Sequence, residues 1–144
     1  MRNTSIALLA VLGLFSASAF ADTATAQKLA DKYAAIAKNI AGSKHETYNG
    51  LNADAGKTFF NRELTIHGKQ IACASCHTTN PANPGAHLVT KKPIKPLAPA
   101  ANPERFSDLD KVEKNFEKHC LDIIGRDCTA EEKGNFIAYL LTVK

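Results

Sequence analysis

The chain has 144 residues, a length that suits one domain, and a formal charge of +4 at neutral pH. Its basic residues are scattered, apart from the loop lysines Lys91, Lys92 and Lys95, so they form no basic stripe of the kind that nucleic-acid binding needs. We interpret these three lysines as part of an ordinary solvated loop, in preference to a docking site for an acidic partner.

The first 21 residues have the pattern of an export signal. Arg2 supplies a positive charge, residues 6–15 form a short apolar run, and Ala19-Phe20-Ala21 places small residues at the two positions that a signal peptidase reads. We therefore predict cleavage before Asp22 and a mature domain of residues 22–144 in the periplasm. An uncleaved membrane anchor is the alternative, which the polar stretch after Asp22 disfavours. No later segment is apolar enough to span a membrane, so we expect no stable membrane insertion.

Two amphipathic helices are predicted in the first half of the mature chain. Apolar residues recur at three- and four-residue steps between residues 25 and 40. A second helix is expected to run from the N-cap Asn52 to Arg62, with Gly56 and Phe60 on one face. The apolar stripe of the first helix consists of Leu29, Tyr33, Ile36 and Ile40.

Residues 78–103 form a long connecting segment without periodicity. All six prolines of the chain fall in it and forbid a regular helix. Loops of this length in a small domain are usually functional, so we expect this one to wrap a cofactor. The prolines are Pro81, Pro84, Pro93, Pro96, Pro99 and Pro103.

Two more helices are predicted in the last third of the chain. One begins at the cap Ser107, with Asp110 three residues on, and ends before a turn near Gly125. The last begins at Thr129, which forms a capping box with Glu132. No segment predicts a strand, so the expected fold class is all-α. The expected buried stripes are Leu109, Val112, Phe116 and His119 in one helix, and Phe136, Tyr139, Leu140 and Val143 in the other.

Gly56 is predicted to lie where two helices cross. We expect the helix that begins at Asn52 to cross the last helix, because a glycine allows close approach of Phe136 or Tyr139.

The segment Cys73-Ala-Ser-Cys76-His77 has the C-x-x-C-H pattern of covalent haem attachment. Its two thiols must reach two vinyl groups of one porphyrin, which a two-residue spacing allows within one helical turn, and the histidine that follows then points at the iron. A thioredoxin-like dithiol needs a βαβ context, which the sequence lacks. A zinc site needs a second ligand pair, and Cys120 and Cys128 have a poor spacing for it.

The two remaining cysteines, Cys120 and Cys128, close a short loop. In an oxidising compartment such an isolated pair favours a disulfide, and two buried free thiols are the alternative.

The second axial ligand of the haem iron cannot be methionine, because Met1 is the one methionine of the chain and leaves with the export signal. An Asn or Lys ligand, or an open position, stays an alternative. Among the histidines we prefer His119, which lies on an apolar stripe and precedes a disulfide cysteine; a core histidine bonded to a carbonyl is the other interpretation. His87 in the Pro-rich loop is the second choice, and His45 and His67 are predicted to lie on the surface.

Several segments together resemble one family, the sphaeroides haem protein group of small class I-like cytochromes c that bind oxygen and other diatomic gases. The resemblance runs from the first helix to the C-terminus. The segments that carry it are Lys95-Pro-Leu-Ala-Pro99, Asn102-Pro-Glu-Arg-Phe106, Val112-Glu-Lys114, Cys120 through Ile124-Gly-Arg-Asp-Cys128-Thr129, and Glu131-Glu-Lys-Gly134.

The resemblance implies a class I cytochrome c core with an additional N-terminal helix, and a disulfide between Cys120 and Cys128. It also implies a redox partner, either a dihaem cytochrome c or a membrane cytochrome b. Oxygen-binding members have a weakly ligating Asn where this chain has His119. Imidazole is the stronger iron ligand, so we expect one low-spin haem c with His77 and His119 as axial ligands.

These features predict an electron carrier that needs no catalytic residues, and not an enzyme. Without a methionine ligand, we expect a low or moderately negative reduction potential. Binding or turnover of oxygen, nitric oxide or carbon monoxide is the alternative function, and it requires His119 to leave the iron. A peroxidase ranks last, because the sequence defines no distal Arg–His pair.

Overall fold

The structure, a computed structural model, describes residues 18–144, with side chains described from Thr23 onward. The predicted export signal and its cleavage site lie outside the described residues, except for backbone at the start of α1. No helix within residues 18–144 is both long and apolar enough to cross a membrane.

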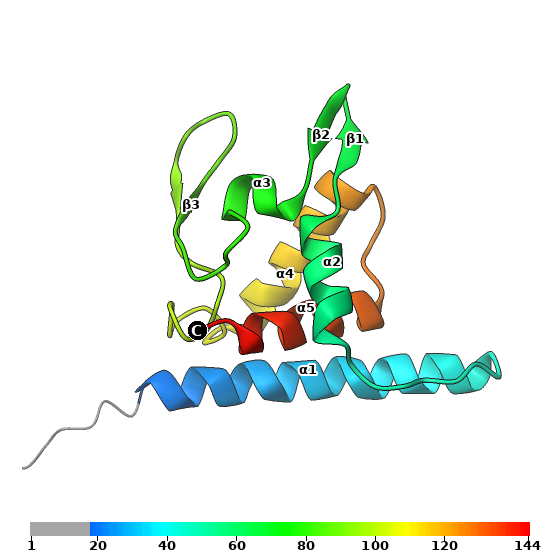
Figure 1. Cartoon of the computed structure of the whole chain (residues 1–144). Coiled ribbons are helices and arrows are strands. Elements are labelled where there is room, and N and C mark those ends of the chain that lie inside the picture. Colours follow the sequence, from blue (N-terminus) through cyan, green and yellow to red (C-terminus); the bar gives the residue numbers. More distant parts are fainter. Residues whose placement is uncertain (1–17) are drawn as a thin grey trace, which may run out of the picture.

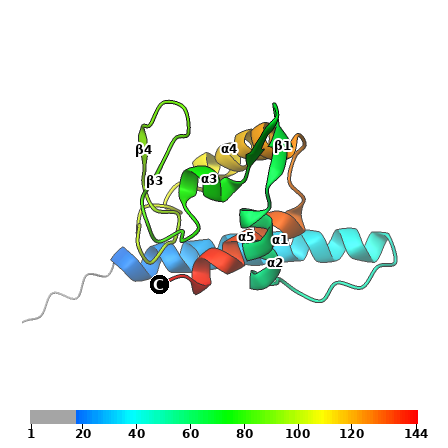
Figure 2. The same ribbon diagram turned by 45° about the horizontal axis from the view of Figure 1, so that its top comes forward.

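The described chain folds into helices joined by loops and two small hairpins. Helices α2 and α5 cross each other and α5 packs against α1, while α3 and both hairpins lie on the side of the molecule away from α1, as Figure 1 and Figure 2 show. The helices are α1 (Ser18–Ser43), α2 (Ala53–Asn61), α3 (Cys73–His77), α4 (Leu109–His119), a π-helical turn η1 (Cys120–Ile124) and α5 (Ala130–Thr142). The strands are β1 (Leu64–Ile66), β2 (Lys69–Ile71), β3 (Gly85–Ala86) and β4 (Pro93–Ile94).

The helix boundaries follow local capping signals. The Asn52 side chain accepts a hydrogen bond from the backbone N–H of Ala55, and Thr129 and Glu132 form the predicted capping box at the start of α5. The predicted start of α4 is wrong by one residue. Asp108 is its N-cap and accepts from the backbone N–H of Lys111 at 3.0 Å, while the Ser107 hydroxyl donates to a backbone carbonyl instead.

The expectation of no strands is also wrong. Strands β1 and β2 pair in antiparallel register, with Leu64 opposite Ile71, and are joined by a two-residue turn. Both turn residues, His67 and Gly68, have positive φ angles of 48° and 74°. Two successive residues with positive φ are typical of the type I′ turn of a tight hairpin. The sequence predicts this turn only weakly, because histidine is not one of the residues that usually occupy its first position. Strands β3 and β4 form a shorter antiparallel pair within the Pro-rich segment.

The helical core is built on aromatic rings and on the buried half of α1. The Phe60 ring of α2 stacks on the Phe136 ring of α5 with centroids 5.7 Å apart, and Leu29 and Tyr33 of α1 belong to the same core. Ile36 and Ile40, which were predicted on the buried stripe, are exposed. The buried face of α1 runs through Ala26, Ala30, Tyr33 and Ala37, so Ile36 lies beside this face. Ile40 lies beyond it, because α1 has 26 residues and α5, with 13, covers about half of its length.

The predicted crossing at Gly56 is confirmed. A Cβ atom at this position would overlap the backbone oxygen of Asn135 and lie 2.9 Å from the backbone nitrogen of Phe136. The Asn135 side chain, which is 7% exposed, also accepts a hydrogen bond of 2.7 Å from the backbone N–H of Asn52. The beginning of α2 is thus bonded to a side chain from the middle of α5, and the two backbones lie close together at Gly56.

Gly56→Ala should therefore destabilise the protein strongly, because one methyl group forces the two helix backbones apart. We expect the free energy of unfolding to fall by about 3 kcal/mol in urea titrations. Gly42→Ala in α1 is the matched control, because a Cβ there meets no atom within 4 Å, and it should leave stability unchanged or slightly raised. Equal stability of the two variants would contradict this account of the crossing.

Candidate functional site

The C-x-x-C-H segment forms the short helix α3, and its side chains open onto one cavity. The Ser75 hydroxyl accepts a hydrogen bond of 2.9 Å from the backbone N–H of Ala72, which fixes the start of this turn. Cys73, Cys76 and His77 are all half-buried and all line the cavity. The structure thus brings together the two thiols and the histidine of the motif.

The cavity walls are mostly apolar and come from elements far apart in the sequence. The cavity is open to solvent, and its empty volume, including the space at the opening, is about 1210 Å³. Helix α2, the loop before α4, and helices α4 and α5 complete the walls around α3. The apolar lining residues include Phe59, Phe60, Ile94, Leu97, Phe106, Val112, Phe116, Phe136 and Leu140.

A second histidine faces His77 across this cavity. The ring centroids of His77 and His119 are 6.2 Å apart. An imidazole nitrogen lies about 2 Å from a bound first-row metal ion and the ring centre roughly 1 Å further, so one ion between two rings separates their centres by roughly 6 Å. The distance between the two rings therefore fits one metal ion bound by both histidines.

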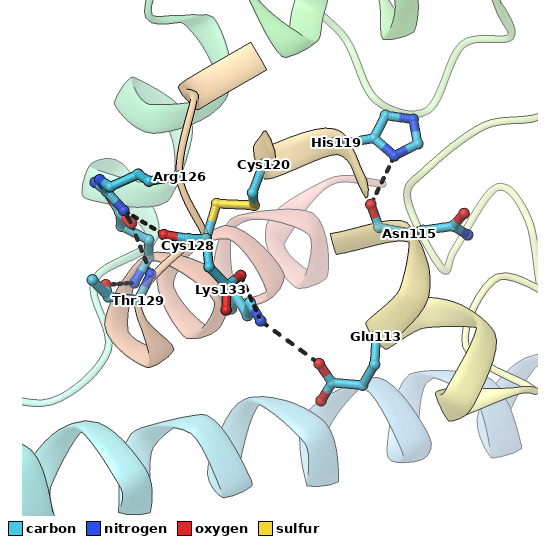
Figure 3. The surroundings of a disulfide bond; sticks show 10 residues. Glu113, Asn115, His119, Cys120, Arg126, Cys128, Thr129 and Lys133 are labelled. Carbon is cyan, nitrogen blue, oxygen red and sulfur yellow. Dashed lines mark hydrogen bonds and ion pairs between the residues drawn. A yellow bond between two sulfur atoms is a disulfide. The ribbon is translucent and has the colours of Figure 1, made fainter. Parts of the chain in front are cut away.

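The hydrogen bond of His119 leaves the appropriate nitrogen free. Its Nδ1 lies 2.7 Å from the backbone oxygen of Asn115, one helical turn earlier (Figure 3). Because a carbonyl oxygen can only accept, Nδ1 carries the proton and Nε2 keeps its lone pair for a metal ion. On the other side, burial lowers the pKa of His77 to about 4, with smaller effects of Arg105 and His119. Its imidazole is therefore neutral at neutral pH, which is the form that binds metal.

The other histidines are placed differently. His45 and His67 are exposed and do not line the cavity, as predicted. His87 does line it, but its Nδ1 lies 3.2 Å and 3.1 Å from the backbone nitrogens of Val89 and Thr90 and accepts from both. The proton of a neutral His87 ring is then on Nε2, which leaves no free lone pair. His119 is the better candidate for the second ligand.

Cys120 and Cys128 form a disulfide directly after His119, with Cα atoms 5.6 Å apart (Figure 3). The π-helical turn η1 runs from Cys120 to Ile124 and is capped by Gly125, whose φ of 79° suits glycine. Beyond it, Arg126 donates two hydrogen bonds to the Glu132 carboxylate, at 2.8 Å and 2.7 Å. The short loop after α4 is thus closed by the disulfide and anchored to the start of α5.

Three further residues shape the site and were not predicted from the sequence. A Cβ atom on Gly85 would overlap the backbone oxygen of Cys76, so glycine lets strand β3 lie against α3. Thr78, directly after His77, has φ 62° and ψ 162°, a strained region for a residue other than glycine. Arg105 is half-buried and lines the cavity, and no described carboxylate lies within ion-pair distance of it.

The rival interpretations of the cysteines lose support. Burial raises the pKa of the Cys73 thiol, whereas a redox dithiol needs a lowered one. In the part of the chain that the structure describes, no three His, Cys, Asp or Glu side chains form a cluster that could hold a zinc ion. The residues present fit a haem group instead: a thiol pair and a histidine on one wall, a histidine opposite, apolar walls between, and an unpaired guanidinium.

Comparisons with known proteins identify relatives of this chain. Residues 46–140 match the model of a family described as a domain of unknown function (DUF1924). Cytochrome c'' from Methylophilus methylotrophus is 56% identical over 137 residues, which cover 94% of this chain and 92% of that protein. Cytochrome c-type protein SHP from Cereibacter sphaeroides is 41% identical over 108 residues, which cover 72% of this chain and 81% of that protein.

Solved structures extend the similarity to the fold. The crystal structure of oxidised cytochrome c'' from Methylophilus methylotrophus superposes with a TM-score of 0.78 and 52% identity, covering 85% of this chain and 98% of that one. The structure of oxidised SHP, an oxygen-binding cytochrome c, has a TM-score of 0.66 and 32% identity, covering 80% and 94%.

Fold and site together define a small all-α c-type cytochrome, whose cofactor is covalently bound haem c. The chain belongs to the family that contains cytochrome c'' and the sphaeroides haem protein SHP.

Proposed function

We propose that this protein is a periplasmic carrier of single electrons, with one haem c attached through Cys73 and Cys76 and ligated by His77 and His119. The observation that carries the proposal is the 6.2 Å separation of the two imidazole rings across the cavity. When bound, the haem supplies reversible one-electron exchange at its iron.

The protein residues hold and orient the cofactor. Cys73 and Cys76 would fix it covalently from α3, and His77 and His119 would ligate its iron from opposite walls. The apolar walls exclude water, and Arg105 supplies a positive charge for the carboxylate groups of the haem. Two ligands that stay in place in both oxidation states keep the structural change on electron transfer small, which favours fast exchange.

The expected partners are other redox proteins, a dihaem cytochrome c or a membrane cytochrome b. No enzymatic activity is required of the site, because no step in electron exchange needs a group that transfers protons or forms bonds to a substrate. Ligation by two histidines, without methionine, supports a low or moderately negative reduction potential.

A second candidate function is the binding of a diatomic gas. Its support is the relation to SHP, whose structure is described as that of an oxygen-binding cytochrome c, and to cytochrome c'', whose solution structure concerns haem-ligand detachment. In this chain, His119 is exposed and lies at the last residue of α4, where the helix changes into a π-helical turn. Release of His119 on reduction would open a coordination site to oxygen, nitric oxide or carbon monoxide.

His119→Ala should change the ferric visible spectrum from low-spin to high-spin, because it removes one of the two strong axial ligands. His87→Ala, the matched change on the same cavity, should keep the wild-type spectrum. Retention of a low-spin ferric spectrum in His119→Ala together with its loss in His87→Ala would reverse the ligand assignment.

Carbon monoxide separates the two functions in the wild-type protein. A carrier with fixed ligation keeps sharp α and β bands after reduction by dithionite, and its spectrum is unchanged by carbon monoxide. A high-spin ferrous spectrum, or a rapid shift on adding carbon monoxide, would favour gas binding and make His119 a displaceable ligand.

Arg105→Gln should lower the reduction potential, because removing a cation beside the haem favours the more positive ferric state. We expect a decrease of about 60 mV, a tenfold change in the one-electron equilibrium, while Arg105→Lys should recover most of it. Arg126→Gln removes an exposed charge that is paired with Glu132 outside the cavity, and should leave the potential nearly unchanged. Potentiometric titration measures all three, and equal shifts in the Arg105→Gln and Arg126→Gln variants would exclude a local effect of Arg105.

A further inference from the structure

The loop that joins β3 to β4, residues 87–92, has a rigid backbone and is called the tip below. The backbone N–H of His87 donates to the oxygen of Lys92 at 2.9 Å, and that of Lys91 donates to the oxygen of His87 at 3.0 Å. Inside this ring of bonds, the His87 side chain accepts from the backbone N–H groups of Val89 and Thr90. The tip therefore has a fixed conformation although its residues are exposed.

This conformation includes backbone strain. Lys91 has a φ of 58° in the left-handed region, which residues other than glycine rarely adopt. Strained residues persist where the surrounding contacts hold them, and they cluster at functional sites.

The tip combines unpaired positive charge with exposed apolar surface. Val89 is 82% exposed, and its neighbour Leu88 is also exposed. Lys91 and Lys92 form no ion pair with any described residue, and residues 85–94 contain no acidic side chain. A protein interface typically has apolar residues at its centre and polar or charged residues around its rim.

The tip also adjoins the haem cavity. His87 at its base and Ile94 of β4 line the cavity, as His77 and His119 do. Another exposed lysine, Lys118, lines the cavity from α4. Asp122 of η1 is the one acidic residue among the described residues that line it. The tip projects on the side of the molecule away from α1 (Figure 1).

We infer that the tip, residues 87–92, is the docking surface for an acidic one-electron carrier protein. This inference rests on the proposed function and extends it by naming where the partner binds. It replaces our interpretation of Lys91 and Lys92 as part of an ordinary solvated loop. Carboxylates of the partner meet Lys91 and Lys92, an apolar contact covers Val89, and the partner's redox centre is thereby held beside the cavity. Such charge complementarity raises the association rate and is weakened by salt.

The test uses the haem-loaded protein and reduced plant-type ferredoxin, an acidic one-electron carrier, as the probe. Stopped-flow spectroscopy measures the second-order rate of reduction over a series of salt concentrations. The variant Lys91→Glu/Lys92→Glu should react about tenfold more slowly at low salt and lose most of its salt dependence. Lys28→Glu/Lys38→Glu, the same charge change on exposed positions of α1, should stay within about twofold of the wild type. Amide NMR signals of residues 88–92, and not those of α1, should shift when the ferredoxin is added.

Equal slowing of the two charge variants, or no slowing of either, would overturn the docking surface. It would also be overturned if Lys91→Glu/Lys92→Glu lost binding to anionic lipid vesicles but kept the wild-type rate with ferredoxin. If the wild-type protein accepts electrons from dithionite but not from ferredoxin at any salt concentration, the proposed docking surface is contradicted and the proposed carrier function is not. If the wild-type protein accepts electrons from neither reductant, both proposals are contradicted.

Discussion

The close approach of α2 and α5 at Gly56 is the constraint on which the rest of the structure depends. With no side chain between them, the two backbones approach closely enough for Asn135 to bind the N-terminus of α2. The same approach stacks Phe60 on Phe136, and both rings also line the haem cavity. The packing that stabilises the helices is therefore also the wall of the site, so a change at the crossing affects fold and cofactor binding together.

Helix α4 is positioned by side-chain contacts with α5 and with α1. The Phe116 ring meets Phe136 of α5 and Tyr33 of α1 edge to face, with centroids 5.9 Å and 6.0 Å away. The ammonium group of Lys133, whose side chain is 12% exposed, lies over both Tyr33 and Phe116 and pairs with Glu113 of α4 at 3.8 Å (Figure 3). Burial, reinforced by nearby Glu113, raises the pKa of Tyr33 far above its usual range, so its hydroxyl stays neutral in this core. Helix α4 is thus held against both α5 and α1, and His119 is its last residue.

Features encoded by neighbouring residues could be predicted from the sequence. The cap Asn52, the Thr129–Glu132 box and the C-x-x-C-H segment each depend on a few positions close in the chain. The start of α4 was misplaced because Ser107 and Asp108 are both able to cap, and the choice depends on where the Ser107 hydroxyl bonds. The roles of Gly85 and Arg105 could not be predicted at all, because they arise when the Pro-rich segment folds back on α3 and forms the cavity. Local patterns therefore predicted which residues line the cavity from α3 and α4, and tertiary structure supplied the surroundings of these residues.

The two sides of the haem site differ in how firmly they hold their histidine. His77 is half-buried and ends a helix against which Gly85 brings strand β3, and the backbone leaves it through the strained Thr78. His119 is exposed, is oriented by one hydrogen bond to Asn115, and is followed by a π-helical turn. The half-buried His77 ring has less room to rotate than the exposed His119 ring, which is oriented by its hydrogen bond to Asn115. The proximal side is thus common to an electron carrier and a gas-binding protein, and the strength of the His119 bond in the reduced state decides between them.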